Sequence, residues 1–125
     1  MGQVCNYCGA EEHLAMEHIF PKKRGGQDDA ENLILSCRSC NSRKGAKDLM
    51  EWMYQQEKFL PLTVMRRYMK LVYTYCVEHD LLEKPLKEVA KMELPFKIEL
   101  LPLKFPPPRK LTFTAPVSTI PETEK

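Results

Sequence analysis

Two C-x-x-C pairs constrain the fold of this chain more than any other feature of its sequence. The first pair reads CNYC at residues 5–8, and the second reads CRSC at residues 37–40. Each pair can supply two thiolates from one tight turn, and two such turns complete the tetrahedron that Zn²⁺ prefers. We therefore predict a structural zinc site formed by Cys5, Cys8, Cys37 and Cys40. Because four thiolates leave no open position on the ion, this zinc would brace the fold and take no part in catalysis.

A redox-active dithiol is the alternative interpretation of these pairs. No thioredoxin-like βαβ pattern surrounds either pair, which favours zinc. The N-terminal sequence MGQVCNYCG lacks the basic and apolar regions of a signal peptide. No apolar run approaches the roughly 18 residues that a membrane span needs. We therefore expect a cytoplasmic protein without a membrane partner, in which the fifth cysteine, Cys76, is a small core residue.

The pattern of apolar residues predicts an α+β fold. The 125-residue length favours one small domain with a tail. Residues 13–17 and 32–37 are expected to be strands, and residues 38–48 a helix capped by Ser36 or Ser39. This order of strand, loop, strand and helix would be tied together by the zinc. We divide the chain into a core with the zinc site (1–48), a helical extension (49–92), and a short strand with a proline-rich, partly disordered tail (93–125).

Two or three helices are expected in the extension. Predicted helices cover residues 49–59, 64–80 and 85–92, and Thr63 is the expected cap of the second. In that helix one apolar stripe is formed by Met65, Met69, Val72 and Cys76. Residues 96–100 alternate like an edge strand. The last ten residues are expected to be disordered, and PPPR (106–109) is either a stiff surface arm or a polyproline ligand for a partner.

Cations cluster in one part of the first half of the chain. All seven Lys and Arg residues of positions 1–50 lie between 22 and 47, although the net charge of the whole chain is only +2. Such clustering allows a small protein to hold a polyanion without a large net charge. Charge alone, however, is more simply explained by a solvated loop and a solvated helix face.

A second group of residues lies between the cysteine pairs. AMEHIFPKKRGG (15–26) places Glu17 beside His18, ENLILSCRSCN contains Asn32 and Asn41, and SRKG follows. With the cysteines, this order of acid-His, Gly-Gly, Asn-Leu, C-x-x-C-Asn and Lys-Gly resembles the HNH endonuclease family. The variant it resembles has asparagine at the third position and a four-cysteine zinc site. The resemblance covers about residues 5–48 and implies a ββα-metal core.

The resemblance implies cleavage of a phosphodiester bond. His18 would be the general base, since imidazole titrates near neutral pH. Glu17 and Asn41 would supply oxygen ligands to a Mg²⁺ or Mn²⁺ ion. Neighbouring side chains on a strand diverge, so Glu17 can face the ion while His18 faces the attacking water. Asn32 would tie the loop to the first strand and hold the His18 backbone in place.

The cations would contact the phosphates of double-stranded DNA. Lys44 is the strongest candidate, because it lies three residues after Asn41 on the same helical face. Gly25 and Gly26 would allow a sharp turn or a close approach of the backbone to the nucleic acid. The full set of predicted phosphate-contacting residues is Lys22, Lys23, Arg24, Arg43, Lys44 and Lys47.

Two positions depart from the commoner family pattern. Glu17 stands where aspartate is usual, which lengthens the reach of the carboxylate. Asn41 stands where histidine is common, which is associated with Mg²⁺ or Mn²⁺ and not with softer metals. His13 and His79 fall outside the pattern and are expected at the surface or in packing.

We therefore expect a metal-dependent DNA endonuclease that leaves 5′-phosphate and 3′-hydroxyl ends. A monomer would nick, and a homodimer or two encounters would break both strands. One alternative is a zinc-stapled module that binds nucleic acid or docks in a complex without cutting. Another is a nuclease that acts only within a larger assembly, such as a phage packaging machine or a bacterial defence complex.

Overall fold

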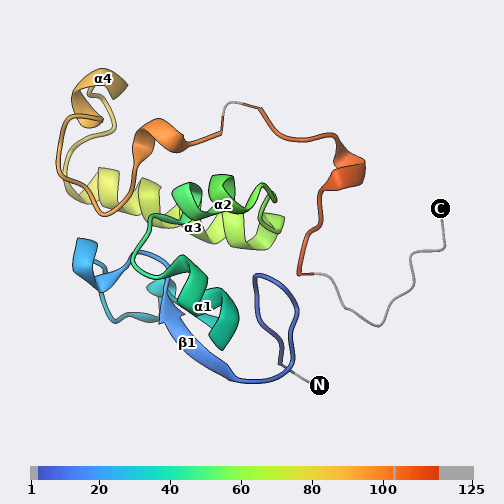
Figure 1. The fold of residues 1–125 in the computed structure, drawn as a ribbon. Helices are drawn as coiled ribbons and strands as arrows, with labels where there is room; N and C mark the ends of the chain where they lie inside the picture. The colour runs from blue at the N-terminus through green and yellow to red at the C-terminus, as the bar shows by residue number, and fades with distance from the viewer. Residues whose placement is uncertain (1–2, 103, 116–125) are drawn as a thin grey trace.

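A ββα unit forms the first part of the molecule (Figure 1). The structure is a computed structural model that describes residues 3–102 and 104–115. Strands β1 (Leu14–His18) and β2 (Leu33–Cys37) pair antiparallel, with His18 opposite Leu33. Helix α1 (Arg38–Lys44) follows β2 without a loop. The predicted α+β class and the order of strand, loop, strand and helix are therefore confirmed.

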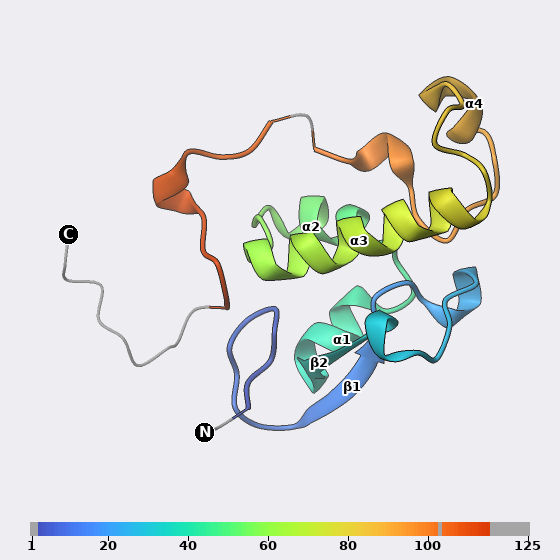
Figure 2. The same ribbon diagram turned by 180° about the vertical axis from the view of Figure 1, so that it is seen from behind.

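Three further helices follow this unit: α2 (Leu49–Gln56), α3 (Leu62–Glu78) and α4 (Leu86–Val89). Both views show α2 and α3 on one side of the ββα unit, with α4 beyond the end of α3 (Figures 1 and 2). Single 3₁₀ turns occupy Lys22–Arg24, Ala30–Asn32, Ile98–Leu100 and Pro108–Lys110. Among the described residues, no helix is long and apolar enough to cross a membrane.

The second cysteine pair determines where α1 begins. Cys37 is its N-cap, and the Cys37 Sγ accepts a hydrogen bond from the Cys40 backbone N–H at 3.4 Å. The prediction of Ser36 or Ser39 as the cap is therefore wrong. The helix also ends earlier than predicted, at Lys44, because Gly45 takes a positive φ of 55°. Serine is a common helix cap, which is why the sequence favoured the two serines. In the structure the Cys37 sulfur is the acceptor that caps the helix.

Aromatic side chains join the ββα unit to the helical extension. Phe20, just after β1, packs edge-on against Tyr68 of α3 at 5.8 Å and lies 5.5 Å from Phe96. Tyr7 packs edge-on against Trp52 of α2 at 5.1 Å. All five rings are buried in one continuous apolar core.

Asp48 is a buried polar junction between the same parts. Its carboxylate caps α2 by accepting hydrogen bonds from the backbone N–H groups of Met50 and Glu51. It also accepts one from the Tyr68 hydroxyl at 2.8 Å and one from the Lys97 backbone N–H at 3.0 Å. Because the side chain is only 1% exposed, these four bonds are what makes its burial tolerable.

Several predictions for the extension need correction. Helix α2 ends at Gln56, where Glu57 turns left-handed, and α3 begins at Leu62 after Pro61 and not after Thr63. The buried stripe of α3 contains Tyr68 in place of Met69, and the Met69 side chain is 41% exposed. The third predicted helix, 85–92, is shorter, because α4 covers only Leu86–Val89.

Residues 96–100 do not form an edge strand. Phe96 is buried in the core, the Lys97 N–H is used by Asp48, and a 3₁₀ turn covers Ile98–Leu100. Pro108 begins another 3₁₀ turn within PPPR. The ten residues predicted to be disordered, 116–125, lie outside the described residues.

Candidate active site and zinc site

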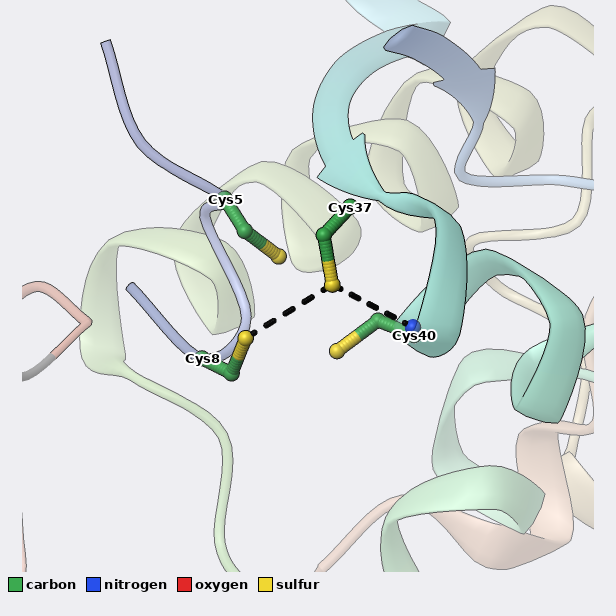
Figure 3. A group of neighbouring side chains, drawn as sticks. All are labelled: Cys5, Cys8, Cys37 and Cys40. Carbon is green, nitrogen blue, oxygen red and sulfur yellow. Dashed lines mark hydrogen bonds between the residues drawn. The ribbon is translucent and has the colours of Figure 1, made fainter. Parts of the chain in front are cut away.

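Four cysteine sulfurs lie together at one end of the ββα unit (Figure 3). The ligand atoms of Cys5, Cys8, Cys37 and Cys40 all lie within 4.8 Å of one another, and the Cys8 and Cys37 sulfurs are 3.7 Å apart. A tetrahedral zinc with Zn–S bonds of about 2.3 Å needs sulfurs about 3.8 Å apart. A disulfide needs about 2 Å, so the cysteines are free thiols. The four cysteines therefore fit a structural Zn²⁺.

Hydrogen bonds from Asn6 attach the turn of the first cysteine pair to β2. The backbone N–H and the side-chain amide of Asn6 both donate to the Leu35 carbonyl, at 3.0 and 3.1 Å. On the other side, the Arg43 guanidinium lies 3.5 Å from the Cys40 sulfur, where its charge suits a thiolate. A zinc ion held by the four cysteines would therefore clamp the N-terminal turn, β2 and the start of α1 together.

Three predicted site residues border one cavity of ≈ 380 Å³. Glu17 and His18 reach it from the end of β1, and Asn41 reaches it from the middle of α1. Glu17, His18 and Asn41 are thus among the residues that line this cavity. A larger cavity of ≈ 680 Å³, between the glycine turn and α3, has Asn32 in its wall. Three of the four predicted catalytic residues therefore border the smaller cavity, and Asn32 borders the larger one.

Glu17 makes one hydrogen bond and one ion pair with side chains from different segments. The Tyr7 hydroxyl donates to Glu17 Oε2 at 2.6 Å, and Lys44 Nζ lies 3.7 Å from Oε1. The carboxylate is 6% exposed. Burial raises the pKa of the Glu17 carboxyl, while the Lys44 charge and the Tyr7 hydrogen bond act in the opposite direction. Burial and the neighbouring Glu17 charge also raise the pKa of Tyr7 well above its usual value, so its hydroxyl remains a donor.

Lys44 does not lie at the surface, so its prediction as a phosphate contact is wrong. Its side chain is fully buried, and its ammonium donates to the His18 backbone carbonyl at 3.1 Å. Burial lowers the pKa of Lys44, and the charges of Glu17 and Asp48 oppose that shift. Lys44 instead neutralises a buried carboxylate and fastens the end of β1 to α1.

Asp28 belongs to the site but was missed in the sequence. Its Oδ1 lies 2.6 Å from His18 Nε2, and its Oδ2 accepts a hydrogen bond from Lys22 Nζ at 2.9 Å. The hydrogen bond to His18, and then Lys22, lower the pKa of the Asp28 carboxyl. Asp28 lies in a polar QDD run that is typical of any loop, and only the folded turn brings it to His18.

Asn32 holds the loop that follows β1. It is 2% exposed, and its Oδ1 accepts from the Phe20 backbone N–H at 2.7 Å. Its Nδ2 donates to the carbonyls of Phe20 at 3.1 Å and Gln27 at 2.9 Å. These bonds are made to the backbone two residues beyond His18, whereas the His18 carbonyl itself is held by Lys44.

The other predicted cations differ in position. Lys22 and Lys23 are exposed and border the small cavity. Arg24 donates to the Ala46 carbonyl at 3.2 Å, and so bridges the turn to the end of α1. Arg43 lies against Cys40, and Lys47 donates to the Arg43 carbonyl at 3.0 Å. Of the six residues predicted to contact phosphates, Lys22 and Lys23 border the cavity that Glu17, His18 and Asn41 share.

The ββα unit thus combines a cluster of four cysteines with a cavity that Glu17, His18 and Asn41 border. Residues 5–47, about a third of the chain, match the family model described as HNH endonuclease. Residues 5–47 are therefore similar to an HNH endonuclease domain. Comparisons with curated proteins and with solved structures gave no match.

Proposed function

We propose that this protein is a metal-dependent endonuclease that hydrolyses phosphodiester bonds in double-stranded DNA, with His18 as the general base. The observation that carries this proposal is the shared cavity at which His18, Glu17 and Asn41 meet. The HNH endonuclease match over residues 5–47 supports the same activity.

Glu17 and Asn41 would hold a Mg²⁺ or Mn²⁺ ion. A carboxylate oxygen and an amide oxygen suit a hard divalent cation, and two protein ligands suffice because water and phosphate oxygens complete the coordination. When bound, such an ion supplies the positive charge that stabilises the phosphate in the transition state. The four-cysteine site has no open position and cannot take this role.

His18 would accept the proton of the attacking water. Its ring is fixed by Asp28 at 2.6 Å, which also stabilises the positive charge that the imidazole gains. The backbone that follows the His18 side chain is held as well, at the His18 carbonyl by Lys44 and at Phe20 by Asn32. A general base needs this kind of fixed geometry to reach one defined water.

Lys22 and Lys23 would bind phosphates that flank the scissile bond. Contacts of this kind position a duplex but do not read its sequence, and they weaken as salt concentration rises. One such site cuts one strand at a time, so a monomer is expected to nick.

A plasmid relaxation assay tests the proposal. The full-length chain loaded with zinc is expected to nick supercoiled DNA with Mn²⁺ or Mg²⁺, and to stop when the free divalent ion is chelated. His18→Ala should lower the rate by at least about 100-fold, because general-base catalysis contributes about that much. The matched control is His79→Ala, which removes the exposed histidine that caps the C-terminus of α3.

Cleavage by His18→Ala at the wild-type rate would refute the assignment of the base. A wild-type chain that binds DNA without cutting it in either metal would instead support the zinc-stapled binding module.

A further inference from the structure

Tyr7 connects the two sites of the molecule. It lies between Cys5 and Cys8 in the first cysteine turn, yet its hydroxyl donates to Glu17 Oε2 at 2.6 Å. The zinc-binding turn therefore touches the carboxylate that borders the candidate active-site cavity.

The tyrosine ring is held in place at several points. Its backbone N–H donates to the Cys5 sulfur at 3.4 Å, and its ring packs edge-on against Trp52 with 81° between the planes. The side chain is only 7% exposed. The hydroxyl thus reaches Glu17 from a ring whose position depends on the cysteine turn and on α2.

The second group near Glu17 is also attached to the zinc site. Lys44 lies 3.7 Å from Glu17 Oε1, and it is on α1, whose first turn contains Cys40. A carboxylate has lone pairs on both oxygens, so a hydrogen bond at Oε2 leaves Oε1 able to bind an ion. Partners of this kind, which touch a ligand and not the metal, commonly change metal affinity by about 10- to 100-fold when they are removed.

We propose that Tyr7 is a positioning residue whose hydroxyl orients the Glu17 carboxylate for the divalent ion, and so couples the four-cysteine site to the active site. This inference rests on the proposed function, because it takes Glu17 as a ligand of that ion. Without the hydroxyl, Lys44 is the remaining partner, and the carboxylate is expected to turn toward its ammonium group and away from the ion.

Mn²⁺ binding to the Tyr7→Phe variant tests the proposal. This variant keeps the ring against Trp52 and removes only the hydroxyl. Binding would be followed by electron paramagnetic resonance of free Mn²⁺ in the zinc-loaded full-length chain, with zinc content measured by mass spectrometry. Tyr7→Phe should bind Mn²⁺ about 10-fold more weakly, while it retains zinc. Tyr54→Phe, which removes an exposed hydroxyl on α2, is the matched control and should bind like the wild type.

The Mn²⁺ concentration that supports cleavage should shift in the same way. Tyr7→Phe is expected to need about 10-fold more Mn²⁺ for half of its maximal rate, and to regain the wild-type rate at saturating Mn²⁺. A purely structural defect would lower the saturating rate and leave the half-saturating concentration unchanged.

Glu17→Gln separates the failure of this inference from the failure of the proposed function. If Glu17→Gln loses Mn²⁺ while Tyr7→Phe binds like the wild type, the role of Tyr7 is refuted and the ion site stands. If Glu17→Gln binds Mn²⁺ like the wild type, the role of Tyr7 and the proposed ion site at Glu17 are both refuted. Loss of zinc from Tyr7→Phe would assign the effect to the cysteine turn and would also refute the positioning role.

Discussion

At the scale of single residues, the site depends on a buried pair of opposite charges. Glu17 and Lys44 lie 3.7 Å apart, with side chains 6% and 1% exposed. Each charge offsets the cost of removing the other from water, so the loss of one partner leaves an uncompensated buried charge. Lys44 also supplies the donor for the His18 carbonyl. Its value to the site is therefore structural and electrostatic, and it does not need contact with DNA.

Lys44→Met is expected to lower the free energy of unfolding by about 3–5 kcal/mol, because Glu17 then stays buried without its cation. Urea denaturation of the zinc-loaded chain measures this change. Lys23→Met is the matched control, since Lys23 is exposed, and it should change stability by less than about 0.5 kcal/mol.

The double variant Lys44→Met/Glu17→Gln should recover part of the lost stability, because no charge then remains buried. Equal stability of Lys44→Met and the wild type would show that the pair contributes nothing to folding.

At the scale of elements, the turn between β1 and β2 sets the position of His18. Gly26 lies so close to Phe20 that a Cβ atom there would be 1.7 Å from the Phe20 carbonyl oxygen. Asn32 binds the same carbonyl and also the Phe20 N–H. The chain is thus pinned just after His18 by one glycine and one amide.

Gly26→Ala and Gly25→Ala should differ sharply. In Gly26→Ala the backbone of Phe20 must move, so the Asn32 hydrogen bonds break and His18 is displaced. The expected loss is about 3 kcal/mol or more, together with the loss of cleavage. Gly25 has open space around its Cβ position, and its φ of 99° costs alanine only about 1–2 kcal/mol. Thermal denaturation and nicking assays on both variants measure the difference, and equal effects would contradict the close contact at Gly26.

Local patterns were sufficient to predict the ββα unit from the sequence. The cysteine spacing identifies the four cysteines that cluster, and the short apolar runs at 13–17 and 32–37 lie within one residue of β1 and β2. These features could be predicted because a tight cysteine turn and a short apolar run are properties of neighbouring residues.

The remaining errors come from contacts between distant segments. Residues 96–100 alternate like a strand, but Phe96 is drawn into the core beside Phe20 and the Lys97 N–H is taken by Asp48. Lys44 has the spacing of an exposed helical cation, and it is buried because Glu17 lies opposite it. Neither partner is identifiable from the local sequence.

At the scale of the whole molecule, the segment that matches the HNH family model and the extension that follows it share one core. One buried apolar cluster contains residues from both sides of the predicted boundary at residue 48, with Cys5 as its first member in the sequence and Phe96 as its last. Tyr7 and Phe20 of the matched segment are covered by Trp52 and Tyr68 of the extension. The family match ends at residue 47, but the packing that supports the matched segment does not.

A fragment of residues 1–48 tests whether the HNH domain can fold alone. It retains all four cysteines, so it should still bind Co²⁺ with the absorption of thiolate ligands. It loses the rings that cover Tyr7 and Phe20, and Asp48 loses the partners that make it a helix cap. We therefore expect poorly dispersed amide resonances and no cooperative thermal unfolding, in contrast to one cooperative transition for the full-length chain.

Trp52→Ala in the full-length chain is the companion measurement, because it removes cover from Tyr7 without shortening the chain. Loss of a large buried aromatic side chain should cost about 3–5 kcal/mol. If the fragment unfolds cooperatively, at a temperature near that of the full chain, residues 49–102 are an appendage to a self-sufficient nuclease fold. If it does not, the zinc and the extension stabilise the ββα unit jointly, since the zinc closes one end of it and the helices α2 and α3 cover its apolar face.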